Sequence, residues 1–174
     1  MDNIYLQVEQ VIDTYQTRNP FDLLDAIDAV TRISYNFDPN GLKGFATIQN
    51  DTMYAVINGH LNEYEQWIVA GHEAAHLILH RDEILNSPGK AMQDFNLFDN
   101  SGRLEHQANR FLADFLLSDE DILGTITESQ GDYFHTASTL EVPPALLAFK
   151  LHSMIGRGFE LINPVGLESG FLGA

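Results

Sequence analysis

The stretch Trp67–His80, WIVAGHEAAHLILH, places three histidines and one glutamate in a run that is otherwise apolar. The apolar residues recur at helical spacing and predict one long buried helix from about Asn62 to about Arg81. Burying polar side chains costs free energy unless each of them is hydrogen-bonded or binds an ion. We therefore expect this helix to carry a functional site and to organise the fold around it.

His72 and His76 are four residues apart, so their rings leave one face of the helix with Cβ atoms ~6 Å from each other. That separation suits a single zinc ion. Glu73 lies about 100° around the helix from His72, where it can act on a water molecule without being a ligand. The arrangement is HExxH. The alternative is a pair of ordinary buried histidines, but chance gives this pattern with a probability on the order of a few percent.

A catalytic zinc takes three protein ligands and keeps one open position. The chain has no cysteine, so the third ligand must be His, Asp or Glu. His80 lies ~12 Å along the helix from His72, which is too far for a shared ion. We expect His80 to support the site or to be structural. Asp82 could be a ligand only if a glycine at position 79 let the chain turn back toward the metal. Because Leu79 stands there, we expect the Asp82 side chain to point away from the metal.

A second helix, predicted over residues 102–117 (GRLEHQANRFLADFLL), offers the third ligand. Glu105 lies among apolar neighbours, which favours a ligand over a solvated surface acid. Asn109, one turn later on the same face, could hydrogen-bond the free N–H of a ligating imidazole. His106 is the alternative ligand.

The remaining pattern predicts an α+β fold, in which a small antiparallel sheet packs on the histidine helix. Residues 1–118 are expected to form this domain, and residues 119–174 a short helical tail packed on it. Strands are predicted at 32–37, 45–50 and 52–59 with a turn at Asn50-Asp51, helices at 3–16, 20–30, after Ser118 and at 144–156, and a loop at 82–99.

The charge excludes some classes of partner. The chain has 25 acidic residues against 9 Lys and Arg, a formal charge of -16, which repels nucleic-acid phosphates. We expect this charge mainly to keep the surface soluble, and the alternative is attraction for a basic partner protein. The predicted tail could be helix-turn-helix-like, but its only cations after Asp119 are Lys150 and Arg157, so we expect no DNA contact. No segment is apolar enough for a membrane span and the N-terminal segment lacks a secretion signal, so we expect a cytoplasmic protein.

HEAAH followed by Glu105 in the pattern E-x-x-A-N-x-F resembles the gluzincin-like ImmA/IrrE family of metallopeptidases. The segments GLKGF and VINGHLNEYEQWIVAGHE are also similar to that family, and the likeness covers about residues 40–118. The resemblance implies a zincin-like domain in which His72, His76 and Glu105 bind zinc. It also implies that Glu73 is the general base.

Family members of this size are often carried by phages and other mobile elements, so the resemblance implies cleavage of a helix-turn-helix repressor and relief of repression. Three alternatives stay open: a protein of the same fold that binds the repressor without cutting it, the toxin of a toxin-antitoxin pair, and a hydrolase of small amides. Several side chains could contact substrate or stabilise the oxyanion, and we do not choose among them: His80, Tyr64, Tyr54, Arg103 and Tyr133.

Overall fold

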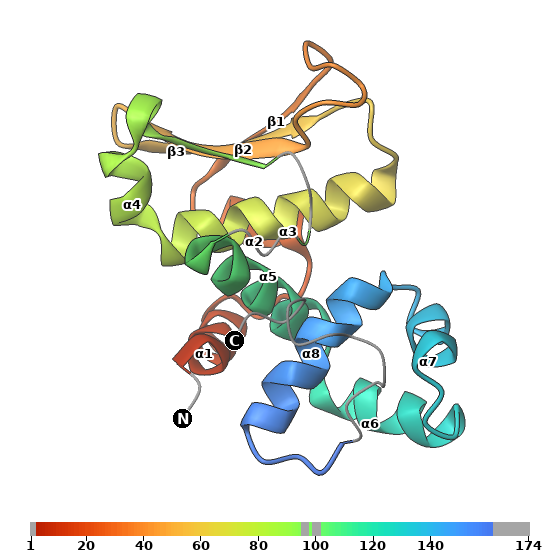
Figure 1. Ribbon diagram of the computed structural model, residues 1–174. Coiled ribbons are helices and arrows are strands. Elements are labelled where there is room, and N and C mark those ends of the chain that lie inside the picture. Colours follow the sequence, from red (N-terminus) through yellow and green to blue (C-terminus); the bar gives the residue numbers. More distant parts are fainter. Residues whose placement is uncertain (1–2, 95–97, 99–101, 162–174) are drawn as a thin grey trace. The chain divides into compact units, whose positions relative to one another are not determined.

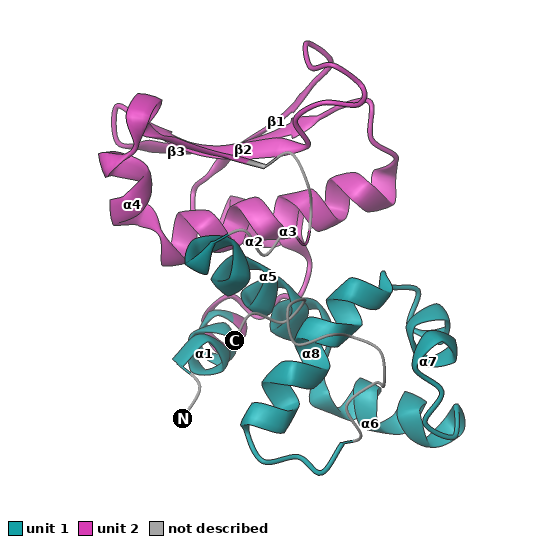
Figure 2. Ribbon diagram, in the orientation of Figure 1, with its two compact units in different colours: residues 1–11, 100–174 teal, residues 12–99 magenta. Residues whose placement is uncertain are grey.

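The computed structural model describes residues 3–94, 98 and 102–161 (Figure 1). Two compact units make up the chain, and Figure 2 shows them in different colours: residues 12–99 form one unit, and residues 1–11 with 100–174 form the other. The described residues hold eight α-helices and four strands, which confirms the α+β class. None of these helices has both the length and the apolar character needed to cross a membrane. The predicted boundary after residue 118 stays a prediction.

The unit of residues 12–99 contains one four-stranded sheet. Its strands are β1 (Val30–Ser34), β2 (Gly44–Gln49), β3 (Thr52–Asn58) and β4 (Ala91–Asp94), in the spatial order β1-β3-β2-β4. Both β3 and β4 pair antiparallel with β2, but β1 pairs parallel with β3. The prediction of an antiparallel sheet is therefore wrong in part. After β1 the chain crosses to β2, and the hairpin then brings β3 back between them in the direction of β1.

Local backbone geometry explains where two elements end. Asn50 and Asp51 have φ of 49° and 61°, the pair of positive values that a type I′ hairpin turn requires, so the predicted turn is confirmed. Helix α2 (Pro20–Ala26) begins as predicted, with the Asn19 side chain accepting hydrogen bonds from the backbone N–H groups of Phe21 and Asp22. It ends earlier than predicted because Asp28 has φ of 58° and the chain then enters β1.

Helix α3 (Glu63–Leu79) is the predicted long buried helix, and it lies along one face of the sheet, against β2 and β3 (Figure 1). A capping box fixes its start. The Asn62 side chain accepts a hydrogen bond from the Glu65 backbone N–H at 2.8 Å, and the Glu65 carboxylate accepts one from the Asn62 N–H at 3.1 Å. Because the cap fixes the first residue of the helix, it also determines on which face of α3 each later side chain lies.

Residues 82–99 are not the loop that the sequence predicted. They contain most of α4 (Arg81–Asn86), the 3₁₀ turn η1 (Pro88–Lys90) and strand β4, while residues 95–97 and 99 lie outside the described chain. These elements are held in place by contacts with residues that are distant in the sequence. The Gln49 side chain donates to the carbonyl of Gly89 at 3.0 Å, and β4 extends the sheet beyond β2.

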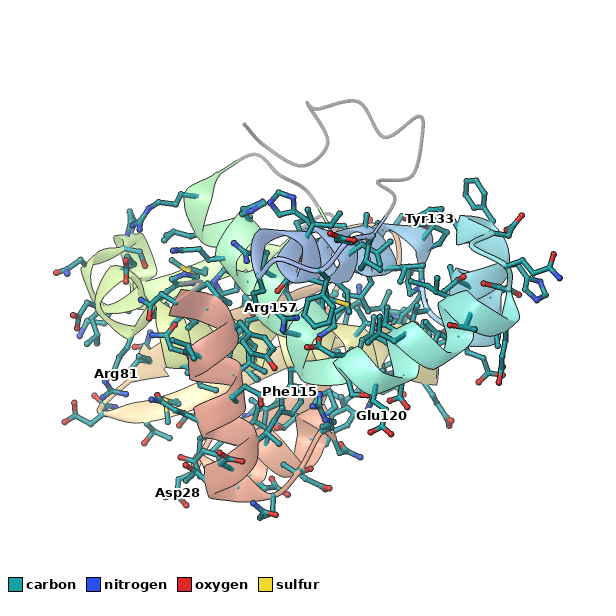
Figure 3. All side chains as sticks on the ribbon, turned by 90° about the horizontal axis from the view of Figure 1, so that it is seen from below. Asp28, Arg81, Phe115, Glu120, Tyr133 and Arg157 are labelled. Carbon is teal, nitrogen blue, oxygen red and sulfur yellow. The ribbon has the colours of Figure 1, made fainter. Side chains whose placement is uncertain are left out.

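The second unit consists of helices. They are most of α1 (Asn3–Tyr15), α5 (Arg103–Leu116), α6 (Asp119–Glu128), α7 (Tyr133–Thr139) and α8 (Pro144–Gly156). Helix α8 packs on α5 and α7, and α6 packs on α7. The predicted cap of α6 is confirmed, because the Ser118 hydroxyl accepts from the Asp121 N–H at 3.1 Å. Figure 3 labels Phe115, which is buried in this unit, and Glu120, which is exposed.

An ionic network ties α8 to the end of α5 and the start of α6. Buried Lys150 contacts Asp114 at 2.9 Å and Asp119 at 2.7 Å, and the Ser153 hydroxyl donates to Asp114 at 2.7 Å. Arg157, labelled in Figure 3, donates two hydrogen bonds to Asp119 at 2.6 and 2.7 Å. Both cations that the sequence places after Asp119 therefore serve internal ion pairs.

Candidate metal centre

Two imidazoles on α3 face each other at the spacing of two ligands of one ion. Nε2 of His72 and Nε2 of His76 are 3.1 Å apart, and the ring planes meet at 73°. Two nitrogens bound tetrahedrally at zinc–nitrogen distances of 2.0–2.1 Å are separated by about 3.3 Å. Both side chains are almost completely buried, at 1% and 0% exposed. The geometry therefore fits a shared metal ion.

The sequence of α3 explains this burial. The residues around the histidines are small or aliphatic, so the helix can lie close to the sheet, and Val69, Ala70, Ala74 and Ala75 are all fully buried. The four-residue spacing then turns both imidazoles to the same side of the helix.

Glu73 follows His72 on α3 and is completely buried. Its neighbour in the sheet is Gly44, the first residue of β2, where a Cβ atom would come within 2.7 Å of Oε1 of Glu73. The absence of a side chain at Gly44 leaves the room that the carboxylate occupies. Sequence reasoning missed this role, although Gly44 lies in the GLKGF segment on which the family resemblance partly rests.

His80 is the C-cap residue of α3. It is 2% exposed, and Nδ1 of His80 lies 2.9 Å from Nδ1 of His76. The histidines of the HEAAH helix therefore form a row in which His76 contacts His72 through one ring nitrogen and His80 through the other.

Glu105 lies in the first turn of α5 and is half-buried, and Asn109 follows one turn later and is fully buried. Glu105, His72 and His76 are a group of side chains that could hold a metal ion. A set of two imidazoles and one carboxylate is a donor set typical of catalytic zinc.

The alternative ligands have other surroundings. His106 is half-buried, with its ring centroid 5.5 Å from that of Phe149 and 6.3 Å from that of His152. Burial, and then the neighbouring His152, lower the pKa of the His106 imidazole. Asp82 is exposed in the first turn of α4. Helix α3 keeps Leu79 as its last residue and ends two residues before the predicted Arg81, because the chain leaves the helical conformation at His80.

The candidates for substrate contact are spread over the chain. Tyr64 is 39% exposed in the first turns of α3, with its ring 6.1 Å from that of Trp67, and Arg103 is exposed at the start of α5. The Tyr133 hydroxyl donates to the carbonyl of Pro144, and burial raises its pKa to about 12. This hydroxyl therefore already has an acceptor within its own unit.

A buried helix that presents HExxH toward a metal site defines a class of metal-dependent hydrolases. Residues 30–152, more than half of the chain, match the model of the IrrE N-terminal-like domain, a peptidase family. The chain belongs to this family, which confirms the resemblance to ImmA/IrrE peptidases. No curated protein and no solved structure matches the chain.

Proposed function

We propose that the protein is a zinc-dependent endopeptidase with a zincin-like site formed by His72, His76, Glu105 and Glu73. The observation that carries the proposal is the 3.1 Å approach of the two Nε2 atoms on a buried helix, in a chain that belongs to a peptidase family. Two imidazoles and a carboxylate, without any thiolate, make a ligand set for a catalytic rather than a structural zinc.

Each residue has a defined part in this proposal. His72, His76 and Glu105 hold the metal, and Asn109 orients one of the imidazoles by hydrogen bonding. Zinc, when bound, supplies a Lewis acid that polarises the scissile carbonyl and acidifies a water molecule. Glu73 takes the proton of the attacking water and later gives it to the leaving amine. The reaction is peptide hydrolysis without a covalent intermediate.

The proposed substrate is a helix-turn-helix repressor of a phage or other mobile element, and its cleavage would relieve repression. Family resemblance supplies this candidate, and electrostatics supports it. A DNA-binding repressor carries a basic surface, whereas this chain has a formal charge of -16. Opposite charges accelerate the encounter of two proteins. The negative charge of this chain also disfavours its binding to nucleic acid.

The direct test is incubation of the zinc-loaded protein with the repressor encoded by the neighbouring gene, followed by electrophoresis and mass spectrometry. We expect two fragments that share one defined boundary. Glu73→Gln should bind zinc as the wild type does and leave the repressor intact, because it keeps the shape of the side chain and loses the base. His72→Ala should lose both the metal and the cleavage.

Other results would assign another function. An intact complex of the wild-type protein with uncut repressor would identify a binding protein of the same fold, and the proteolytic proposal would be abandoned. Growth arrest that the neighbouring gene product cures would favour the toxin of a toxin-antitoxin pair. Wild-type protein that binds no stoichiometric zinc would remove the basis of the mechanism.

A further inference from the structure

The ligand His76 uses both of its ring nitrogens. Nε2 faces Nε2 of His72 at 3.1 Å, on the side where a metal ion would be shared, and Nδ1 lies 2.9 Å from Nδ1 of His80. His80 therefore contacts the ligand through the nitrogen that the metal does not need. The proposed ligand set does not include His80, whose role in the site is otherwise open.

The chemistry of imidazole determines which ring nitrogens carry the protons in this contact between His76 and His80. A neutral ring carries one N–H donor and one acceptor nitrogen. When His76 gives the lone pair of Nε2 to a metal ion, its proton must be on Nδ1. Two nitrogens 2.9 Å apart form a hydrogen bond only if one donates and the other accepts. Nδ1 of His80 is then the acceptor, and His80 keeps its own proton on Nε2.

We propose that His80 is a positioning residue for the metal ligand His76. Its Nδ1 accepts the Nδ1–H of His76, and this hydrogen bond fixes both the tautomer and the ring orientation that direct Nε2 of His76 toward the metal. The inference rests on the proposed zinc site and adds to it a residue that touches the ligand but not the ion.

The backbone at the end of α3 holds His80 in place for this task. Its N–H still donates to the carbonyl of His76 at 2.9 Å, which keeps the two residues on adjacent turns. Its own backbone angles, φ -123° and ψ 30°, then leave the helix. Its carbonyl accepts from the N–H of Ile84 at 2.9 Å, where α4 begins. The residue is thus anchored on both sides of the bend.

Burial makes the hydrogen bond effective. His76 is 0% and His80 is 2% exposed, so water does not compete for either nitrogen. Partners of this kind, which bond the outer nitrogen of a ligating histidine, typically change metal affinity 10- to 100-fold when they are removed. A purely structural histidine would change the stability of the fold and leave metal affinity unaltered.

The test compares the Zn²⁺ affinity of the wild-type full chain with that of variants of it, each measured by competition with a chromogenic chelator. His80→Leu removes the acceptor, and we expect affinity to fall roughly 10- to 100-fold. His80→Asn keeps an acceptor oxygen near the position of Nδ1 and should recover most of the loss. Ile84→Ala, a buried apolar truncation on α4, is the control, and it should lower thermal stability without changing zinc affinity.

A measurement on the unaltered protein does not depend on how the variants fold. Two-bond ¹H–¹⁵N spectra of the zinc-loaded wild type should show the His76 proton on Nδ1, shifted downfield by hydrogen bonding. A His76 ring bound to zinc through Nδ1 would overturn the inference. Wild-type affinity in His80→Leu, or an equal loss in His80→Asn and His80→Leu, would also overturn it.

These results separate the inference from the proposed function. If the wild type binds zinc tightly but cuts no protein, the peptidase proposal fails, and the role of His80 is still decided by the affinities. If the repressor is cut and all variants bind zinc equally, the role of His80 fails and the peptidase proposal stands. A wild type without zinc affinity overturns both.

Discussion

A Cβ atom on Gly44 would lie 2.7 Å from Oε1 of Glu73, which is closer than two such atoms can approach. The same atom would lie 2.6 Å from Cγ1 of Val69 and 3.0 Å from the carbonyl oxygen of Val56. The sheet and the histidine helix therefore meet at a point where only glycine fits, and the proposed general base occupies the space that a side chain would take.

Gly44→Ala should consequently displace the Glu73 carboxylate. We expect cleavage to fall at least about 10-fold, because the base must lie within hydrogen-bond reach of the proton it takes. Zinc affinity should stay within a few-fold of wild type, since the ligands are on other residues. Overpacking should also lower the free energy of unfolding by about 1–3 kcal/mol. Peptidase assays, chelator competition and urea unfolding measure the three effects.

Gly124→Ala on α6 is the matched control. A Cβ atom there meets no atom within 4 Å, and alanine in a helix is more stable than glycine by about 0.5–1 kcal/mol. This variant should be slightly more stable and fully active. If Gly44→Ala cleaved as fast as Gly124→Ala, the packing of β2 against Glu73 would have no bearing on catalysis.

Two substitutions can distinguish Glu105 from its neighbour His106 as the third zinc ligand. Glu105→Gln should weaken zinc binding by at least about 10-fold, because an amide oxygen is a poorer ligand than a carboxylate. His106→Gln should retain zinc, since the His106 ring lies against Phe149 and His152. Isothermal titration with zinc distinguishes the two. Loss of zinc in His106→Gln alone would transfer the role of third ligand to His106.

Local patterns in the sequence were enough to predict the elements that carry the candidate site. Helical spacing predicted α3 and α5, and cap residues such as Asn19 and Ser118 were identified by their side-chain chemistry. The four-residue spacing of His72 and His76 puts both side chains on one face of the helix, which allows the 3.1 Å approach of their Nε2 atoms. These features depend on residues within about one turn of each other.

Other features depend on contacts that are distant in sequence. The strand signals of β1 and β3 say nothing about direction, so their parallel pairing was missed. Residues 81–94 carry only short elements, and β4 exists because β2 offers it an edge. The clearance at Gly44 likewise requires the sheet to lie on α3. No local sequence pattern predicts any of these contacts.

Lys150 gives a prediction for the stability of the helical unit. Lys150→Met would remove the ammonium group that contacts Asp114, a carboxylate that is 1% exposed and also accepts a hydrogen bond from the Ser153 hydroxyl on α8. Removing one partner of a buried ion pair costs about 3–5 kcal/mol, because the other charge stays buried. Urea denaturation should show this loss.

The control for Lys150→Met is the double variant Lys150→Met with Asp114→Leu. It removes both charges and replaces them with apolar side chains of similar size, so it should recover much of the lost stability. A double variant less stable than Lys150→Met would show that the cost comes from packing rather than from an uncompensated carboxylate.

Asp119 should make stability depend on pH in the acid range. Burial alone would raise the pKa of its carboxyl, but hydrogen bonds from Arg157 and Lys150 outweigh burial and lower the pKa from 3.8 to about 2. A carboxyl whose pKa is lower in the folded chain contributes stability that is complete above pH 3.8 and is lost as pH falls through about 2. The wild type should therefore lose stability between pH 4 and pH 2 more steeply than Asp119→Asn, by about 1 kcal/mol once solvent screening of this partly exposed group is included. Urea unfolding at a series of pH values and low ionic strength measures the difference, because urea does not screen ion pairs as a salt would. Parallel curves for the two proteins would show that the ion pairs of Asp119 do not stabilise the fold.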